Sequence, residues 1–340
     1  MENHNRQVLL KRRPNGMPQV ADFAIVDASI LEPAEGEALV RGIYLSLDPY
    51  MRGRISATRS YAKPVEIGAV MEGRVVGQVV RSRDPAFRPG DYVFGGYGWQ
   101  LYSAVAGSGL VRLDPAEAPL STALGVLGMP GLTAYVGLND IGRPQQGETV
   151  VVSAASGAVG AVAGQLARRA GATVIGIAGG ADKCRFVETE LGFDAAIDHR
   201  AADLSEALDR ACPNGIDVYF ENVGGPVQQA VFPHLNDFGR VVMCGMIAEY
   251  NDVEPRPGPN LMSVVRKRLK IQGFIVSDQW QRWGEYRALA APLVNRGTLK
   301  YREDLVEGLD RAPEAFIGLL QGKNFGKLLI RLGDDPTRSG

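Results

Sequence analysis

Short β-like apolar runs, interrupted by Gly and Pro, fill the chain up to about residue 125. Examples are Ala38–Ser46, Val70–Val80 and Asp91–Ala104. Strand-length runs bounded by turn residues are typical of β-structure. This part of the chain is therefore predicted to form an irregular, mainly β domain.

The pattern changes after Glu148, where strand-like runs begin to alternate with segments of helical spacing. Thr149–Ser153 (TVVVS) is β-branched and apolar, as expected for a strand buried on both faces. Helices are predicted in Gly157–Gly171 and through Cys184–Leu191. Such alternation predicts an α/β fold of parallel βαβ units, a doubly wound sheet of the dinucleotide-binding (Rossmann) type. Six candidate strands fit that sheet: Thr149–Ser153, Thr173–Ala178, Ala195–Asp198, Asp217–Glu221, Arg240–Cys244 and Lys270–Val276.

The last part of the chain returns to a mixed pattern, with a predicted helix at Ala312–Leu320 and a strand at Lys327–Leu332. We expect it to rejoin the first domain, so that a nucleotide-binding domain (127–303) is inserted into a catalytic domain (1–126 and 304–340). The proline-rich segment Glu254–Asn260 predicts a loop over a cleft. The basic run Arg266–Lys270 is interpreted as a solvated helix end, because no aromatic-basic pattern of a nucleic-acid site surrounds it.

Composition narrows the classes of partner. With 340 residues, 45% hydrophobic and 22% charged, the chain is long enough for two cores. Its formal net charge of -1 provides no basic field for nucleic acid or anionic membranes. No apolar run reaches the ~18 residues of a membrane helix, and none near the N-terminus resembles a secretion signal. We therefore expect a cytoplasmic protein.

Metal ligands are scarce in this sequence. No two cysteines have metal-site spacing, which predicts free thiols and no zinc site. The residues concerned are Cys184, Cys212, Cys244, His4, His199 and His234.

The segment Ser153–Gly160 (SAASGAVG) follows an apolar strand and opens a helix. Glycines at such a turn let backbone N–H groups approach a pyrophosphate at the positive end of the helix. Ala155 stands where the first glycine of the full fingerprint would be, with Gly157 and Gly160 following. The position between strand and helix indicates a dinucleotide site; the alternative is a turn that serves packing alone.

The end of the second strand indicates which nucleotide to expect. NAD sites usually carry an acidic residue there for the ribose 2′-OH. Here the strand ends Ala178-Gly179-Gly180, and Asp182 and Lys183 follow. Lysine can neutralise a 2′-phosphate, so NADPH is predicted, unless Lys183 is only a solvated residue of the first helical turn. We expect Asp182 to cap that helix.

Several segments together resemble the zinc-independent medium-chain dehydrogenases/reductases, in the branch of leukotriene/prostaglandin, double-bond and bacterial curcumin reductases. The resemblance implies a GroES-like catalytic domain, NADPH-dependent reduction of C=C bonds in α,β-unsaturated carbonyl compounds, and a homodimer formed by edge pairing of Lys270–Val276. Zinc alcohol dehydrogenases carry Gly-His-Glu where this chain reads Met71-Glu72-Gly73. The matching segments cover nearly the whole chain: Leu45–Arg54, Gly128–Tyr135, Ser153–Gly160, Ala178–Lys183, Phe220–Gly225, Cys244–Asn251, Gln272–Val276 and Gly322–Lys327.

The resemblance also implies cofactor contacts. Pro130 and Thr133 would lie beside the nicotinamide, and Lys183 at the 2′-phosphate. His199 and Arg200 occupy a stretch where the family often carries a tyrosine, so either is a candidate for a further 2′-phosphate contact. The implied cofactor-binding residues are Pro130, Thr133, Gly157, Ala158, Val159, Gly179, Lys183, His199, Asn222, Cys244, Gly245, Tyr250, Phe274, Ile275, Val276, Asn324 and Gly326.

Enone reduction needs a hydride near the β-carbon, stabilisation of the carbonyl oxygen and a proton for the α-carbon. Without a metal, a hydrogen-bond donor must serve, and tyrosine keeps its proton at neutral pH. Tyr250 follows the C-terminal end of a strand, where sites on open α/β sheets form, and the resemblance makes it the active-site tyrosine. Tyr50 is the second candidate, with packing as an equal alternative. Arg52 is either a substrate contact or, as we favour, structural.

Four points stay open at this level. The proton donor is Tyr250, a ribose hydroxyl relay or water. Met129 and the Trp280–Trp283 stretch either line the pocket or, as is more usual for such tryptophans, pack in a core or interface. The chain is an enone reductase, an NADPH quinone oxidoreductase or a cofactor-binding protein without turnover. The substrate class ranges over small alkenals, oxo-lipids and curcumin-like diarylheptanoids.

Overall fold

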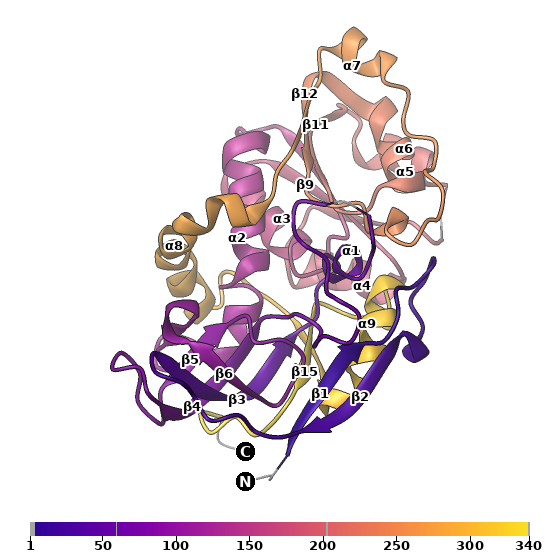
Figure 1. Ribbon diagram of the computed structural model, residues 1–340. Coiled ribbons are helices and arrows are strands. Elements are labelled where there is room, and N and C mark those ends of the chain that lie inside the picture. The colour runs from indigo at the N-terminus through magenta and orange to yellow at the C-terminus, as the bar shows by residue number, and fades with distance from the viewer. Residues whose placement is uncertain (1–3, 59, 202, 339–340) are drawn as a thin grey trace. The chain divides into compact units, whose positions relative to one another are not determined.

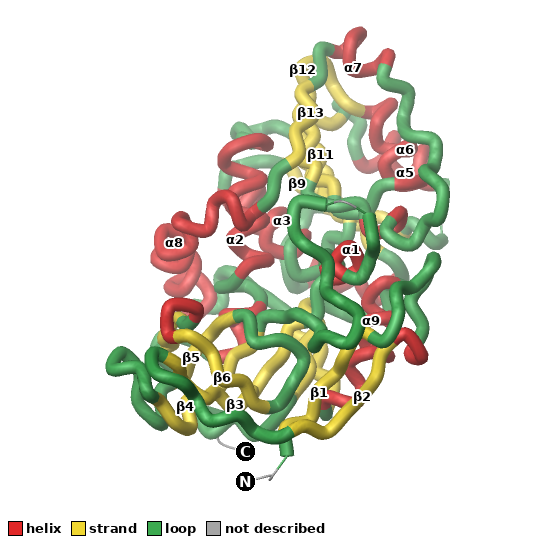
Figure 2. Tube along the Cα trace, in the orientation of Figure 1, coloured by secondary structure: helices red, strands yellow, loops and turns green. Residues whose placement is uncertain are grey.

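The computed structural model describes residues 4–58, 60–201 and 203–338, which form two compact units (Figure 1 and Figure 2). Unit 1 contains the chain up to Leu124, Glu303–Asn324 and the residues from Leu328 onward. Unit 2 contains Gly125–Arg302 and Phe325–Lys327.

Unit 1 is built on antiparallel β-structure. Its larger sheet runs in the order β14-β15-β3-β4-β5-β7, and β6 also pairs with β3. A smaller sheet joins β1 to β2. The strands are β1 (Asn5–Leu10), β2 (Phe23–Ala28), β3 (Glu37–Ser46), β4 (Val75–Ser82), β5 (Tyr92–Gly95), β6 (Tyr102–Ala106), β7 (Val111–Leu113), β14 (Glu303–Glu307) and β15 (Lys327–Arg331).

Two predicted strands of unit 1 have different limits in the structure. The run Val70–Val80 becomes a strand only from Val75, and Asp91–Ala104 divides into β5 and β6. The division surrounds Gly98, which has φ +82°, where a Cβ would lie 2.7 Å from the Met71 carbonyl oxygen. A turn in this left-handed conformation ends the extended chain.

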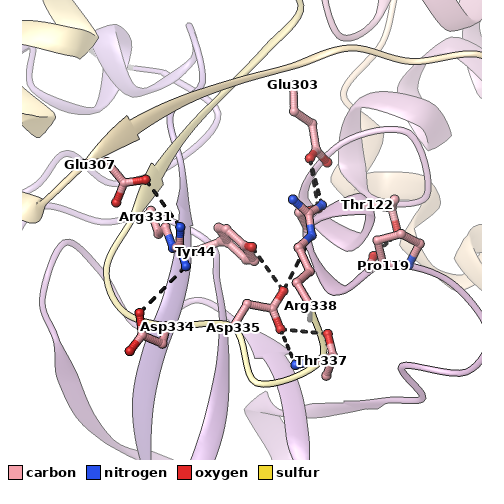
Figure 3. Close-up of polar contacts among 11 residues, drawn as sticks. Tyr44, Pro119, Thr122, Glu303, Glu307, Arg331, Asp334, Asp335, Thr337 and Arg338 are labelled. Carbon is pink, nitrogen blue, oxygen red and sulfur yellow. Dashed lines mark hydrogen bonds and ion pairs between the residues drawn. The ribbon is translucent and has the colours of Figure 1, made fainter. Parts of the chain in front are cut away.

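The C-terminal residues of unit 1 are held against β3 by a buried carboxylate, Asp335 (Figure 3). Tyr44 Oη donates to Asp335 Oδ2 over 3.0 Å, and Thr337 donates its backbone N–H and its hydroxyl to Oδ1. Arg338 approaches Asp335 at 3.9 Å and pairs with Glu303 at 3.5 Å. Because its oxygens accept several hydrogen bonds, the burial of this carboxylate is compensated.

Unit 2 contains a parallel sheet that, over the described residues, has six strands in the order β10-β9-β8-β11-β12-β13. The predicted α/β fold class, with a doubly wound sheet and a separate mainly β unit, is confirmed. The first strand is buried on both faces, as its apolar sequence requires, since Val150, Val151 and Val152 are fully enclosed. The strands are β8 (Thr149–Ser153), β9 (Thr173–Ala178), β10 (Ala195–Asp198), β11 (Ile216–Glu221), β12 (Leu235–Met243) and β13 (Lys270–Gly273).

Helices cover both faces of this sheet. Residues of α5, α6 and α7 share one core with Val151, Ile175 and Tyr219, while α3 packs on β8 and β9. The α-helices of the chain are α1 (Met51–Arg54), α2 (Met129–Val136), α3 (Gly160–Arg169), α4 (Ala181–Thr189), α5 (Leu204–Ala211), α6 (Gly225–Val231), α7 (Met262–Lys267), α8 (Trp283–Asn295) and α9 (Ala312–Leu320). Shorter helical segments are η1 (Val20–Asp22), η2 (Gly107–Gly109), η3 (Leu120–Leu124), the π-helical η4 (Gly137–Gly142), η5 (Phe232–His234), η6 (Ile247–Glu249), η7 (Val276–Arg282) and η8 (Leu309–Arg311).

Several predicted limits in unit 2 are wrong by a few residues. Strand β13 ends at Gly273 rather than Val276, because its neighbour β12 ends at Met243, the partner of Gly273, and offers no further backbone groups. Strand β12 starts five residues before the predicted Arg240. Helix α3 starts at Gly160, three residues after the predicted start, Gly157, which still belongs to the turn that begins at Ala154.

Two surface segments have the predicted form. Arg266 and Lys267 lie in the last turn of α7, which leads into β13. Glu254–Asn260 has no regular secondary structure. Within the described ranges, no helix combines the length and apolar character needed to cross a membrane.

Candidate cofactor-binding site

The turn between β8 and α3 is tight. Gly157 N–H donates to the Ala154 carbonyl over 2.9 Å, and a Cβ at Gly160 would lie only 2.4 Å from that same oxygen. Gly157, Ala158 and Val159 are half-buried just before α3, and no side-chain hydrogen bond caps this helix at Val159. The positive end of α3 therefore opens on a backbone turn, the arrangement that binds a pyrophosphate.

The missing first glycine of the motif is tolerated for two local reasons. The left-handed conformation falls on Ala154, which has φ +49°, and not on Ala155. Ala155 is fully buried, and its Cβ packs against Gly176 of β9. A Cβ on residue 176 would lie only 2.8 Å from the Ala155 Cβ, so glycine at that position makes room for the alanine. The role that the fingerprint gives to one glycine is thus shared between a strained alanine and a glycine on the next strand.

Basic side chains from the residues after β10 and from α4 lie near the turn that follows β9. A Cβ at Gly179 would lie 2.9 Å from His199 Nε2 and 2.9 Å from Arg200 Nε, so both side chains lie directly over the turn. Lys183 is half-buried in the first turn of α4. The prediction that Asp182 caps α4 is wrong: the cap position is Gly180, and the Asp182 carboxylate pairs with Arg185 at 3.0 Å.

Sequence reasoning missed the residue that organises this turn, Asp198 at the end of β10. Its Oδ1 accepts the Gly180 N–H over 2.8 Å and the Arg200 N–H over 3.0 Å. These hydrogen bonds lower the pKa of Asp198 below its usual range. The carboxylate is therefore occupied with backbone and holds the β9 turn against the residues after β10.

A second organising carboxyl group, also missed, is Glu221 at the end of β11. It is fully buried, and its Oε1 accepts from Ser153 Oγ over 2.9 Å and from the Val223 N–H over 2.7 Å. Burial raises its pKa, opposed by the Val223 hydrogen bond. Asn222, a predicted cofactor residue, donates its N–H to Ser153 Oγ over 2.8 Å and its Nδ2 to the Ser153 carbonyl over 2.7 Å.

The backbone of Glu221 also locates the end of β12. Its carbonyl accepts the N–H groups of Cys244 over 2.9 Å and Gly245 over 3.1 Å. Burial raises the pKa of the Cys244 thiol to about 12, which keeps it protonated. The structure thus brings the predicted residues Asn222, Cys244 and Gly245 together at neighbouring strand ends.

Tyr250 lies directly after η6 and turns back towards the end of β12. Its hydroxyl accepts the Met246 N–H at 3.4 Å, and a Cβ at Gly245 would lie 2.9 Å from the hydroxyl oxygen. The side chain is half-buried. A phenol hydroxyl is therefore held beside the strand ends where open α/β sheets bind their ligands.

Other predicted cofactor residues of unit 2 lie on α2 and after β13. Pro130 and Thr133 are buried, and the Thr133 hydroxyl donates to the Met129 carbonyl over 2.7 Å within the helix. Phe274–Val276 is half-buried and follows β13. Gly326 has φ +89° and passes so close to Arg302 that a Cβ would lie 2.3 Å from its carbonyl oxygen. Asn324, half-buried, belongs to unit 1.

The tryptophans of the predicted pocket stretch are engaged in packing. Trp283 is 8% exposed, and its Nε1 donates to the Leu127 carbonyl over 2.8 Å. Its ring stacks on Trp280 with centroids 5.2 Å apart. Trp283 is thus a core residue of unit 2, while Met129 is half-buried at the start of α2.

Tyr50 stands immediately before α1 in unit 1 and is half-buried. Burial raises its pKa, and the carboxylates of Asp48 and Glu72 raise it further, so the phenol stays protonated. Arg52 is 6% exposed and donates to the Gly16 carbonyl over 2.8 Å, which supports the structural role that we favoured.

Glu72, which the resemblance predicts to replace a histidine ligand of the zinc alcohol dehydrogenases, pairs with Arg54, whose Nη2 lies 2.7 Å from Oε2. Over the described part of the chain, no group of three or more His, Cys, Asp or Glu side chains is placed to hold a metal. All three cysteines are free.

Comparison with known proteins agrees with this geometry. Residues 6–113 match a family model described as the N-terminal domain of oxidoreductase, and residues 158–294 match one described as zinc-binding dehydrogenase. The chain is 48% identical to the NADPH-dependent curcumin reductase of Escherichia coli (strain K12), covering 98% of this chain and 99% of that protein. It is 40% identical to the 2-alkenal reductase (NADP(+)-dependent) of Nicotiana tabacum, covering 97% and 98%.

A solved structure extends the likeness to three dimensions. CurA from Vibrio vulnificus, in complex with NADPH, superposes with a TM-score of 0.93 at 49% identity, over 97% of this chain and 100% of that one. The chain therefore belongs to the medium-chain dehydrogenase/reductase family, in the branch that contains the curcumin, 2-alkenal and prostaglandin reductases.

Proposed function

We propose that this enzyme reduces the C=C bond of α,β-unsaturated ketones and aldehydes, without zinc. The observation that carries the proposal is the Tyr250 hydroxyl, held beside Gly245 at the end of β12, in a chain that resembles curcumin and 2-alkenal reductases along nearly its whole length. The chain is an NADP-dependent oxidoreductase, and NADPH is its cofactor, as the sequence predicts.

The residues of unit 2 suit this cofactor. When bound, NADPH supplies a hydride. The turn at Gly157–Val159 would hold the pyrophosphate, and Lys183 with His199 beside Gly179 the 2′-phosphate. Asn222, Cys244 and Gly245 would line the cofactor at the strand ends. The remaining members of the proposed set are Pro130, Thr133, Tyr250, Phe274, Ile275, Val276, Asn324 and Gly326.

The protein's own contribution to catalysis is a protonated phenol. Tyr250 would donate to a ribose hydroxyl or to the carbonyl oxygen of the enone, where negative charge develops. Tyr50 is the second candidate donor, because burial raises the pKa of its hydroxyl and keeps it protonated. A tyrosine phenol ordinarily keeps its proton at neutral pH, so neither residue needs a metal to act as a hydrogen-bond donor.

Stopped-flow oxidation of NADPH with three acceptors tests the proposal: an alkenal, a phenylpropenone and a benzoquinone. We expect rapid oxidation with the first two, and mass spectrometry should find the saturated carbonyl compound, not the allylic alcohol. Oxidation with the quinone alone would contradict enone reduction. NADPH binding without oxidation by any acceptor would indicate a non-catalytic protein.

We further propose a homodimer that pairs through β13. This strand forms one edge of the sheet, and all four of its residues, Lys270–Gly273, are exposed. An exposed strand edge offers unpaired backbone groups to a second strand. One chain has a mass of 36.5 kDa. Size-exclusion chromatography with light scattering should measure twice that mass, and the mass of a single chain would contradict the proposal.

A further inference from the structure

The position of His199 has a consequence beyond a third polar contact. Asp198 pairs with Ala178 at the ends of β10 and β9, so His199 and Gly179 are the first residues beyond the paired strands. The His199 N–H donates to the Ala178 carbonyl over 3.1 Å. Its imidazole then lies over Gly179, with Nε2 2.9 Å from where a Cβ would stand.

The charges around this imidazole come from three elements. Arg200 follows on the same segment and lies over the same glycine, and Lys183 acts from α4. Asp198 opposes them, although its Oδ1 is taken by two backbone N–H groups. Cys184, also on α4, stays uncharged because burial raises its pKa to about 11.

In the protein without ligand, this environment disfavours a charged imidazole. Partial shielding of the ring from water is the largest cause that lowers the pKa of His199, and the cationic Arg200 is the next. His199 is nonetheless exposed over more than a third of its surface, so a ligand can reach it. The ring is therefore largely neutral near pH 7.

We propose that His199 is a specificity-determining residue that binds the 2′-phosphate of NADPH through a protonated imidazole, so that the protein takes up a proton when it binds NADPH and none when it binds NADH. The inference rests on the proposed location of the 2′-phosphate beside Lys183 and Gly179. A phosphate carries close to two negative charges at neutral pH and outweighs the repulsion from Arg200 and Lys183. The proton comes from solvent and adds to a ring nitrogen; no other bond changes.

Proton uptake fixes the sign of the pH dependence. Binding of NADPH raises the affinity of His199 for a proton, so by linkage the affinity for NADPH rises as the pH falls. The rise begins at the pKa of His199 in the complex and levels off below its pKa in the free protein. One proton limits the slope to a factor of about ten per pH unit. Preference for NADPH over NADH should therefore increase at lower pH.

The experiment measures dissociation constants for NADPH and NADH between pH 5.5 and 8.5. The proteins are the natural chain, His199→Tyr, which keeps a hydrogen-bond donor that does not titrate in this range, and Arg200→Gln. We expect the NADPH/NADH preference of the natural chain to rise several-fold from pH 8 to pH 6. In His199→Tyr, the NADPH/NADH preference should no longer change with pH. Arg200→Gln should bind NADPH more weakly but keep the pH dependence of the natural chain. Protonation of the phosphate itself is common to all three proteins and cancels in the comparison.

A second measurement needs no substitution. The chain has only three histidines, so the imidazole ¹⁵N signals of His199 can be assigned against those of His4 and His234. NADPH should raise the pKa of His199, and NADH should leave it unchanged. Calorimetry in two buffers of different ionisation enthalpy should count a fraction of a proton taken up with NADPH alone.

Two results would overturn the inference: an unchanged slope in His199→Tyr, or a His199 pKa that NADPH does not move. Either leaves the proposed site itself intact if Lys183→Ala still loses NADPH preference. If Lys183→Ala binds both cofactors as the natural chain does, the 2′-phosphate lies elsewhere, and the proposed site fails together with this inference.

Discussion

Replacement of Lys183 with alanine tests the cofactor site directly. Lys183 is half-buried in the first turn of α4, beside a turn that carries no carboxylate to bind a ribose 2′-OH. A charge-assisted hydrogen bond to a phosphate is worth ~1.5–3 kcal/mol. At about 1.4 kcal/mol per decade, Lys183→Ala should reduce the preference for NADPH over NADH about 10- to 150-fold. Because solvent screens a half-exposed lysine and Arg200 remains nearby, we expect the lower half of that range.

The matched control is Arg185→Ala, two positions further along the same helix. Arg185 is exposed and pairs with Asp182 at 3.0 Å, so its loss should change neither affinity by more than about twofold. Dissociation constants for both cofactors are measured by calorimetry at pH 8. An equal loss of NADPH and NADH affinity in Lys183→Ala, or an equal loss of preference in the two variants, would refute the assignment.

Three further predictions concern catalysis, metal and packing. Tyr250→Phe should lower kcat for an enone about 5- to 100-fold with little change in Tm; full turnover there, combined with a loss in Tyr50→Phe, would reverse our ranking of the two tyrosines. Dialysis against a strong chelator should leave turnover intact, and activity that is lost and then restored by zinc would contradict the metal-free proposal. Gly164→Ala should destabilise the protein by about 1–3 kcal/mol, since the added Cβ would lie 1.8 Å from the Phe193 ring. Gly284→Ala, with nothing within 4 Å, should instead gain up to about 1 kcal/mol from helix propensity; thermal melts that rank the two variants otherwise would refute this packing.

The sequence predicted secondary structure best where burial leaves little choice. The apolar runs at Thr149–Ser153 and Thr173–Ala178 are strands β8 and β9 with the predicted limits. The predicted strand limits are wrong where the length of a strand depends on the strands beside it. The polar start of β12, Leu235–Gly239, has no strand-like pattern, and β13 ends where β12 has no more partners to offer. Asp182 has the right residue type for a cap but lies two positions too far along.

What the sequence by itself determined is the positions of six strands along unit 2, to within a few residues, the glycine-rich turn at Ser153–Gly160 and the absence of a carboxylate at the end of the second strand. Each of these is a local property of consecutive residues. Only the tertiary structure decided which distant side chains meet. His199 lies over Gly179, and Asp198 binds Gly180, because β10 pairs with β9 in one particular register. Glu221 binds Ser153 because β11 lies beside β8. These strand pairs join segments far apart in the chain, and a slip of one residue in either register would turn every side chain of the strand to the other face of the sheet.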